Sequence, residues 1–322
     1  MQEQPLISVV IPNWNGAHHL PVCLDSLRRQ SYPRVEVIVV DNHSRDESVN
    51  LLEREYPEVK VLALDENRGF AGGVNAGIEA AQGEVLAVLN NDTEADAEWL
   101  EQLWRALEHS PMAGSATSKI LLFDQRQIIN SAGDLYGVDG IPINRGVWEE
   151  DKGQFDEVER VFSPCGGACA IRRSMLEDLA SRGQEGPFDE DFFAYCEDVD
   201  LGWRAQLAGW ECLYVPTGVV YHRLSATGGG KIASYYTGRN FLCVLAKDYP
   251  FSLFKKYWRR VLLAQWRISW EALKAWRGEA ARARLRGQLA GLWGLPRQWR
   301  KRRTVQAGRV VSDEYLESVL AK

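Results

Sequence analysis

The 322-residue sequence lacks any long apolar run. Its longest stretch without a formal charge, from Gln4 to Leu24, is interrupted by three prolines, two asparagines and two histidines. A membrane-spanning helix needs about 20 apolar residues, so we expect none. No Lys or Arg precedes Arg28, so the start of the sequence lacks the basic region of a signal peptide. We therefore expect a cytoplasmic protein.

Cysteine is also sparse, with six residues and no pair at CxxC spacing. In a large cytoplasmic chain we expect these cysteines to be small buried hydrophobic side chains, and a zinc site on Cys165 and Cys169 is the lesser alternative. The rest of the composition is ordinary, since 45% of the residues are hydrophobic and 25% are charged. These fractions exclude a disordered, collagen-like or wholly coiled-coil chain.

Acidic residues are scarce at one end of the chain. Residues 251–322 contain 17 Lys and Arg against 5 Asp and Glu, whereas residues 1–250 contain 21 against 39. The net charge of −6 and the acidic body argue against a nucleic-acid partner, whose phosphates the body would repel. The sharp change in composition predicts a boundary near Pro250.

The basic tail has the pattern of an amphipathic helix, with Lys and Arg between apolar residues spaced three or four apart. The apolar stripe consists of Phe254, Trp258, Leu262, Trp266, Trp270, Leu273 and Trp276. Two interpretations stay open. Either this helix packs on the rest of the protein with its Trp in an intramolecular core, or residues 251–303 attach to an anionic membrane. The second would make the protein peripheral on the inner face of the plasma membrane.

Strand and helix patterns alternate along the first 110 residues. Short apolar runs predict buried strands at 6–11, 35–40, 59–64 and 84–89. Helical spacing predicts helices at 18–29, 46–55, 70–81 and 96–109, the second of them capped by Ser44. This order predicts an α/β fold with a parallel sheet and helices on both faces.

Polar residues follow all four strands. Asn15 comes after the first strand, Asp41 after the second, Asn67 after the third and Asp92 after the fourth. Ligands of such sheets bind outside the carboxyl ends of the strands, so we expect a binding site there. The glycine-rich segment 69–77 is not a P-loop. It indicates either close helix packing or a backbone cradle for a diphosphate at a helix N-terminus.

The densest acidic stretch lies between Phe188 and Arg204. Its carboxylates alternate with aromatic residues, so we expect some of them to face a cleft. They are Asp189, Glu190, Asp191, Glu197, Asp198 and Asp200. From Glu197 the spacing becomes helical, and Arg204 lies one turn beyond Asp200, where an intrahelical ion pair and a functional role both stay open. His222 follows near the end of a later apolar run.

Six blocks in order resemble the inverting glycosyltransferases of family 2, and most closely their bacterial rhamnosyltransferase-like branch. They read SVVIPNWNG, VIVVDNHSRDES, NRGFAGGVNAGI, LNNDT, FDEDFFAYCEDVDLGWR and VVYHRLSATGG. The resemblance covers about residues 6–245. It implies the GT-A fold, which is Rossmann-like with a mostly parallel central sheet. It also implies a nucleotide-sugar donor and a divalent cation, Mg²⁺ or Mn²⁺.

With the boundary near Pro250, this resemblance implies a catalytic domain at 1–250 and a helical C-terminal extension at 251–322. Within the catalytic domain, a nucleotide-sugar half would occupy about residues 1–120. An acceptor and catalytic half would occupy about residues 121–250.

The resemblance assigns donor-binding roles by position. The residues concerned are Pro12, Asn15, Asp41, Asn67, Gly69, Asn91, Asp92, Gly166, Gly167 and Arg204. Asp41 would accept a hydrogen bond from N3–H of uracil or thymine. Asp92 would bind the metal as the last residue of the family's DxD motif, which here reads Asn90-Asn91-Asp92 and so lacks one carboxylate. His222 would complete the metal shell.

Asp198 lies where the family has its catalytic base, with Glu197 beside it. The base would take the proton of an acceptor hydroxyl as that oxygen attacks the anomeric carbon, and a single displacement would invert the carbon. A close Glu197 would raise the pKa of Asp198 toward the working pH. Arg239 and Asn240 resemble a pair found in the rhamnosyltransferase-like branch.

The expected function is the transfer of a sugar to a hydroxyl of a glycan or polyprenyl-linked glycan, with rhamnose from dTDP-rhamnose as the leading donor. A transferase of UDP-hexoses is one alternative, because Asp41 would bind uracil and thymine alike. A non-catalytic nucleotide- or glycan-binding module is another. The altered DxD motif permits that module, and the presence of Asp198 and His222 opposes it.

Overall fold

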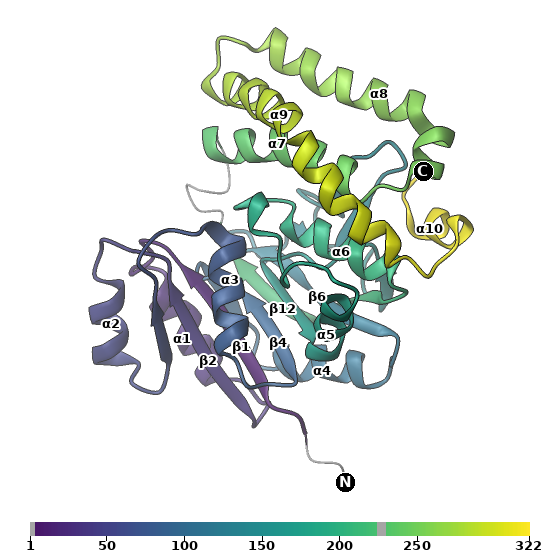
Figure 1. Ribbon diagram of the computed structural model, residues 1–322. Helices are drawn as coiled ribbons and strands as arrows, with labels where there is room; N and C mark the ends of the chain where they lie inside the picture. Colours follow the sequence, from purple (N-terminus) through teal and green to yellow (C-terminus); the bar gives the residue numbers. More distant parts are fainter. Residues whose placement is uncertain (1–3, 224–229) are drawn as a thin grey trace.

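The computed structural model describes residues 4–223 and 230–322, and Figure 1 shows an α/β body with a group of helices above one end of its sheet. The body contains β1 (Ile7–Asn13), α1 (Leu20–Arg28), β2 (Val35–Asp41), α2 (Ser48–Glu55), β3 (Lys60–Ala63), α3 (Gly69–Ala80), β4 (Val85–Leu89), β5 (Thr93–Ala95), α4 (Trp99–Glu108), β6 (Ala113–Leu122), β7 (Ile129–Ser131), β8 (Asp134–Tyr136), β9 (Pro142–Asn144), β10 (Glu159–Val161), β11 (Ala168–Arg172), α5 (Arg173–Ser181), the 3₁₀ helix η1 (Glu190–Phe192), α6 (Glu197–Leu207) and β12 (Glu211–His222). The helices that follow are α7 (Lys231–Lys247), α8 (Phe251–Lys274), α9 (Glu279–Ala307) and α10 (Asp313–Val319). The end of the sixth sequence block, at 224–229, lies outside the described residues.

The central sheet has the strand order β10-β12-β6-β11-β4-β1-β2-β3. β1 is parallel to β2 and β4, and β2 is parallel to β3, so the expected parallel core is present. β11 runs antiparallel between β4 and β6, and β12 is parallel to β6. Because β11 joins the two groups of parallel strands, the segments 1–120 and 121–250 contribute to one sheet.

Helices cover both faces of this sheet, as the alternating apolar residues of β1 require. Val9 packs in one core with α1 and α4. Val10 faces the opposite core with α3, α5 and α6. The glycine-rich α3 lies close on the sheet, because a Cβ added at Gly77 would come within 2.3 Å of Val10 Cγ1. The expected close helix packing in this segment is therefore confirmed.

The predicted strands and helices of the first 110 residues are all present with slightly shifted ends. The predicted cap of α2 is wrong. This helix begins at Ser48 after Glu47, and the side chain that accepts from the Ser48 backbone N–H is Asp46, at 3.1 Å. The hydroxyl of Ser44 instead accepts a hydrogen bond from the backbone N–H of Asn15 at 2.8 Å. A serine between a strand and a helix can either cap the helix or hydrogen-bond to the backbone of another loop, and spacing alone does not distinguish the two.

The C-terminal helices pack on one another and on the body. α9 lies against α7 so closely that a Cβ added at Gly287 would come within 2.0 Å of the Tyr235 carbonyl oxygen. A shared core with α6 contains Trp203, Val244 and Leu253. None of the helices formed by residues 4–223 and 230–322 is long and apolar enough to cross a bilayer.

Candidate active site

The ends of β1, β2 and β4 meet in a hydrogen-bond network centred on the buried Asn13. Its Nδ2 donates to Asp41 Oδ1 at 3.1 Å, and its Oδ1 accepts from Asn91 Nδ2 at 2.7 Å. Gly16 is required here, since an added Cβ would lie 2.1 Å from Asn91 Nδ2. The polar residues after these strands therefore gather at one edge of the sheet. The central place of Asn13 was not anticipated from the sequence; its signal was its position at the end of the first buried strand.

The Asp41 carboxylate is buried and held from both sides. Besides the bond from Asn13, its Oδ2 accepts from the backbone N–H of Ser44 at 3.0 Å. Ser44 in turn holds the exposed Asn15 through the bond described above. Pro12 is partly buried next to Asn13 in β1. Pro12, Asn15 and Asp41 thus form one rigid wall of the site.

The start of α3 forms a second wall. The Gly69 N–H donates to Asn67 Oδ1 at 2.8 Å, and Asn42 Nδ2 donates to the Gly69 carbonyl at 2.7 Å. Gly69 has a φ of +71°, and an added Cβ would lie 2.4 Å from the Phe193 carbonyl oxygen. Glycine is therefore the residue that this turn accepts.

The expected metal ligands, Asp92 and His222, face each other. His222 Nε2 lies 3.1 Å from Asp92 Oδ1, because β5 pairs with the end of β12. His222 Nδ1 lies 2.9 Å from Asn130 Oδ1. An Nδ1–H donated to this amide oxygen leaves the Nε2 lone pair directed at Asp92. Asn130 was not anticipated from the sequence.

This pair fits a divalent cation. In an octahedral shell with bonds of about 2.1 Å, neighbouring ligand atoms lie about 3 Å apart, which is the separation of the Asp92 oxygen and the His222 nitrogen. Two acceptor atoms at this distance repel each other unless a cation or a proton lies between them. Histidines that bind metals commonly donate their other ring N–H to an oxygen, as His222 would to Asn130.

The turn after β4 is joined to the loop that holds Asp198. The Asn90 N–H donates to the Gly167 carbonyl at 2.9 Å. The neighbouring Gly166 N–H donates to Asp198 Oδ2 at 2.8 Å, and the Val199 N–H donates to Asp198 Oδ1 at 2.8 Å. The structure therefore brings Gly166 and Gly167 together with Asp198, next to the turn that carries Asn91 and Asp92.

The neighbouring acids Glu197 and Asp198 differ in their surroundings. Asp198 is partly buried, and burial raises its pKa while the two backbone N–H donors favour the ionised form. Glu197 is 5% exposed, and its Oε2 has no hydrogen-bond partner among the described residues. Burial raises the pKa of Glu197 well above its ordinary value, and the charge of Asp198 adds to this. Burial is thus the largest cause of the raised pKa of both acids.

A third carboxyl group, that of Asp134, lies beside Asp198. An Asp134 oxygen, the Cys165 Sγ and an Asp198 oxygen are all within 4.8 Å of one another. Burial raises the pKa of Asp134 well above its ordinary value, with the Asp198 charge as a further cause. Burial thus favours the neutral form of Asp134. Its sequence gave no signal, because it lies among short strands outside the six blocks.

Burial also raises the pKa of the Cys165 thiol well above its ordinary value, so this thiol is neutral. Five of the cysteines are buried and Cys165 is partly buried, and all six are free, as expected. Among the described residues, the cluster around Asp198 contains Cys165 and not Cys169. The zinc alternative therefore gains no support.

Three of the six acids in the 189–200 stretch form buried ion pairs instead of facing a cleft. The pairs are Asp189–Lys247 (2.7 Å), Asp189–Lys301 (2.6 Å), Asp191–Lys301 (2.7 Å), Asp200–Lys247 (2.5 Å) and Asp200–Arg204 (2.8 Å). Burial alone would raise the pKa of Asp189, but Lys247 and Lys301 hold it well below its ordinary value. These acids attach α7 and α9 to the body.

The contacts of Arg204 are all within the protein. Its side chain is 1% exposed, and its guanidinium binds Asp200 and the carbonyl oxygens of Gly186 and Pro187. The Asp200 partner is fully buried, Pro187 is partly buried and Gly186 is exposed. The intrahelical ion pair, which the spacing left open, is the interpretation that this geometry supports.

Asn240 has a definite role in the geometry before α6. Phe193, Tyr195 and Cys196 all have positive φ values, between 63° and 68°. The buried Asn240 Nδ2 lies within 3.0 Å of the carbonyl oxygens of Phe192, Ala194 and Tyr195. The side chain thus clamps an unfavourable backbone that leads directly into Asp198.

Comparison with known proteins identifies the family. The sequence model of glycosyl transferase family 2 matches residues 8–180, more than half of the chain. The chain belongs to this family. Among curated relatives of this glycosyltransferase, an N-acetylglucosaminyl-diphospho-decaprenol L-rhamnosyltransferase of Mycobacterium tuberculosis is 30% identical over 247 residues, covering 69% of this chain and 78% of the relative. The amylovoran biosynthesis glycosyltransferase AmsB of Erwinia amylovora is 28% identical over 230 residues, covering 69% and 71%.

Solved structures confirm the expected GT-A fold of this glycosyltransferase. GalNAc-T7 with UDP, GalNAc and Mn²⁺ superposes with a TM-score of 0.60 at 20% identity, covering 77% of this chain and 48% of that one. Residues 1–349 of TarS from S. aureus, in complex with UDP, superpose with a TM-score of 0.56 at 18% identity, covering 94% and 90%. At this identity the likeness concerns the fold alone.

Proposed function

We propose that this glycosyltransferase works by inversion, with Asp198 as the catalytic base. The observation that carries the proposal is the contrast among the three neighbouring acids. Asp134 and Glu197 are buried, which favours their neutral forms, whereas Asp198 is more accessible, lies at the start of α6 and receives two backbone hydrogen bonds. Asp198 is therefore the ionised member of the group, and a base must be ionised to accept a proton.

The reaction follows from this assignment. An acceptor hydroxyl approaches the anomeric carbon from the face opposite the nucleotide diphosphate. As the new C–O bond forms, Asp198 takes the hydroxyl proton, and the bond to the diphosphate oxygen breaks with its electron pair on that oxygen. One displacement inverts the anomeric carbon. Glu197 and Asp134 keep water and competing charge away from the base.

We further propose that Asp92 and His222 hold a divalent cation, Mg²⁺ or Mn²⁺, with His222 oriented by Asn130. Such a cation would neutralise the charge on the departing diphosphate. The solved relative with Mn²⁺ bound and the 3.1 Å separation of the two ligand atoms support this assignment.

The donor we propose is a UDP- or dTDP-sugar, with dTDP-rhamnose as the leading candidate. Pro12, Asn15, Asp41, Asn67 and Gly69 form the two walls described above, and Asn91 and the loop of Gly166 and Gly167 complete the pocket. Asp41 would accept from the pyrimidine N3–H. The mycobacterial relative named as a rhamnosyltransferase supports rhamnose, and its name supports a polyprenyl-diphosphate-linked sugar as the acceptor.

A donor screen tests this function. The purified protein is incubated with UDP- and dTDP-sugars and bacterial lipid extract, with Mn²⁺ or EDTA, and release of nucleotide diphosphate is followed. We expect metal-dependent release from dTDP-rhamnose, loss of release in Asp198→Asn and retention in the matched control Glu197→Gln. If nucleotide diphosphate is released only from a UDP-hexose, the donor is that UDP-hexose and not dTDP-rhamnose. Calorimetry without binding of any UDP or dTDP species would indicate a non-catalytic module.

A further inference from the structure

The first tail helix, α8, has two different apolar faces. One face contains Leu253, Val261 and Ala272, which are buried against the protein. The other contains exposed residues that the intramolecular core does not use. They are Trp258 (45% exposed), Leu262 (53%), Trp266 (57%), Trp270 (45%) and Leu273 (49%). Of the two interpretations left open by the sequence, the one with the tail tryptophans in an intramolecular core is wrong, since all six are 45% to 86% exposed.

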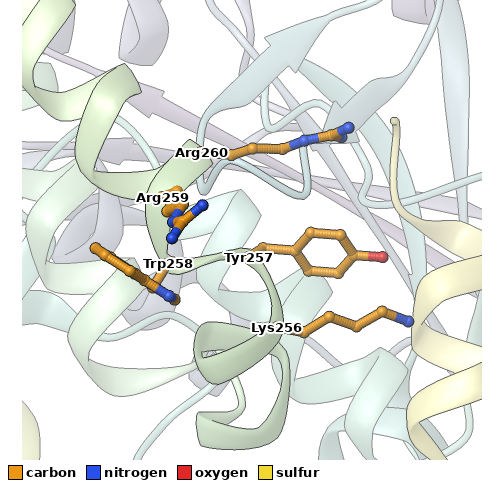
Figure 2. Close-up of a pocket in the computed structure, with 5 residues that line it drawn as sticks. All are labelled: Lys256, Tyr257, Trp258, Arg259 and Arg260. Atoms are coloured by element: carbon orange, nitrogen blue, oxygen red, sulfur yellow. The ribbon is translucent and has the colours of Figure 1, made fainter.

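We call the exposed stripe from Trp258 to Leu273 the outer face of α8. Its residues are three or four positions apart, so they lie along one side of the helix. Trp266 and Trp270 stack with ring centroids 5.8 Å apart. Figure 2 shows the side chains near the start of this face. Lys256 and Tyr257 extend to one side of α8, and Trp258 projects away from them.

Basic side chains accompany these rings. Arg259 lies over the Trp258 ring at 5.4 Å, and Lys274 lies 5.9 Å from the Trp270 ring. Lys255, Arg259 and Arg267 have no ion pair within the described ranges 4–223 and 230–322. This contrasts with Lys301, which is neutralised by acids of the body. The outer face thus combines tryptophans with uncompensated positive charge.

We propose that the outer face of α8 docks this enzyme on an anionic lipid bilayer. Tryptophan prefers the boundary between headgroups and acyl chains, where the ring is in apolar surroundings and the N–H remains hydrated. Lys and Arg beside it attract anionic headgroups. The stripe of α8 provides both along one side of a 24-residue helix, which suits a helix lying in the plane of the interface.

The position of α8 relative to the site suits this partner. The tail helices lie at the end of the body where β1 and β2 finish (Figure 1). α7 and α9 contact the segment before Asp198 through Asn240 and Lys301. Docking through α8 would therefore hold the site near the bilayer. This step rests on the proposed function, in which the acceptor is linked to a polyprenyl lipid.

Charge separates the bilayer from a second copy of the chain as the occupant. A self-complementary contact would bring the basic residues of two outer faces together, where like charges repel. The acidic body, with 39 Asp and Glu against 21 Lys and Arg in residues 1–250, also disfavours random orientation on anionic lipid. The tail is thus the basic part that an anionic surface selects.

Vesicle flotation of the full chain tests the proposal without donor or acceptor. Vesicles contain phosphatidylcholine alone or with phosphatidylglycerol at about one third. We expect binding to the mixed vesicles that falls with added NaCl, and weak binding to pure phosphatidylcholine. Trp266→Ser/Trp270→Ser and, separately, Arg259→Glu/Arg267→Glu should each reduce binding about tenfold or more.

Matched controls use exposed residues of the body. Trp148→Ser removes a Trp that is 62% exposed, and Arg54→Glu/Lys152→Glu reverses two surface charges. Both controls should float like the wild type, and circular dichroism checks the fold of each variant. Equal flotation of tail variants and controls would overturn the proposal. A second result would also overturn it. In that result the wild type does not bind vesicles, sedimentation shows a dimer, and the Trp266→Ser/Trp270→Ser variant is monomeric. Binding of dTDP, measured separately by calorimetry, distinguishes a failed docking surface from a failed donor site.

Discussion

Two groups of acidic residues near α6 differ in their partners. Asp189, Asp191 and Asp200 each contact a Lys or Arg, and these contacts attach the tail helices to the body. Asp134, Glu197 and Asp198 have no such partner within the described residues. The difference teaches that a cation, rather than burial, marks an acid as structural here. Burial raises the pKa of each acid without a cation, and Asp198 is the one among them that we propose as the base.

The largest expected effect separates the members of the second group. Asp198→Asn removes the base, and we expect kcat to fall about 10²- to 10⁴-fold. Glu197→Gln replaces a neutral acid by a neutral amide, so kcat should stay within about threefold. Steady-state release of nucleotide diphosphate measures both. Equal losses in the two variants would remove the distinction between these neighbouring acids.

The next effect concerns the structural group. Asp200→Asn leaves Lys247 and Arg204 buried without their shared counter-charge, so we expect the free energy of unfolding to fall by about 3–5 kcal/mol. Urea unfolding followed by circular dichroism measures it. The matched control, Glu271→Gln, breaks an exposed pair with Lys274 and should cost less than about 1 kcal/mol. Similar losses in both variants would show that burial of the Asp200 pairs contributes little.

The proposed metal site gives a smaller effect, which acts through Asn130, a residue outside the expected ligand set. Asn130→Ala releases the His222 ring, and we expect the Mn²⁺ concentration for half-maximal activity to rise about 10- to 100-fold. Saturating Mn²⁺ should restore most of kcat, because both ligands remain. Activity that no Mn²⁺ concentration restores would instead place Asn130 in the fold or the donor pocket.

The pH dependence should show the raised pKa of Asp198 directly. Asp198 acts when ionised, so activity is lost as the pH falls through its pKa. Since burial raises that pKa, the acid limb of kcat/KM should lie above the ordinary Asp range of about 3.9. The pKa of Asp189 is shifted in the opposite direction, because its ion pairs with Lys247 and Lys301 lower it. Its lowered pKa gives a stabilisation that is present above the unfolded-state value and is lost only as the pH falls through the lower folded-state value.

Circular dichroism over the same pH range is the control, because the ion pairs of Asp189 should keep the fold intact through the acid limb. Loss of structure in parallel with loss of activity would attribute the limb to unfolding instead of to the base.

The sequence predicted the parts of the fold that depend on local pattern. Buried apolar runs located β1, β2, β3 and β4, and the rule for parallel sheets placed Asp41 and Asp92 at one edge. The pairing of Asp92 with His222 followed from family resemblance, and the structure brings the two side chains together.

The remaining features depend on contacts between distant segments. Asp134 approaches Asp198 because the short strand β8 folds back beside the loop of Cys165. The acids at 189–200 looked alike in sequence, and only the positions of Lys247 and Lys301 on α7 and α9 separate the structural from the chemical ones. The apolar stripe of the tail was visible in sequence, but whether it was covered depended on which side of α8 faces the body.

The anomeric configuration of the product tests the central claim most directly. The transfer is run with the donor that the screen identifies, and proton NMR of the purified product gives the configuration at the transferred sugar. A single displacement with Asp198 as base predicts inversion relative to the nucleotide sugar. Retention of configuration would contradict the account, because it requires two displacements or a front-face route that one base in this position does not provide.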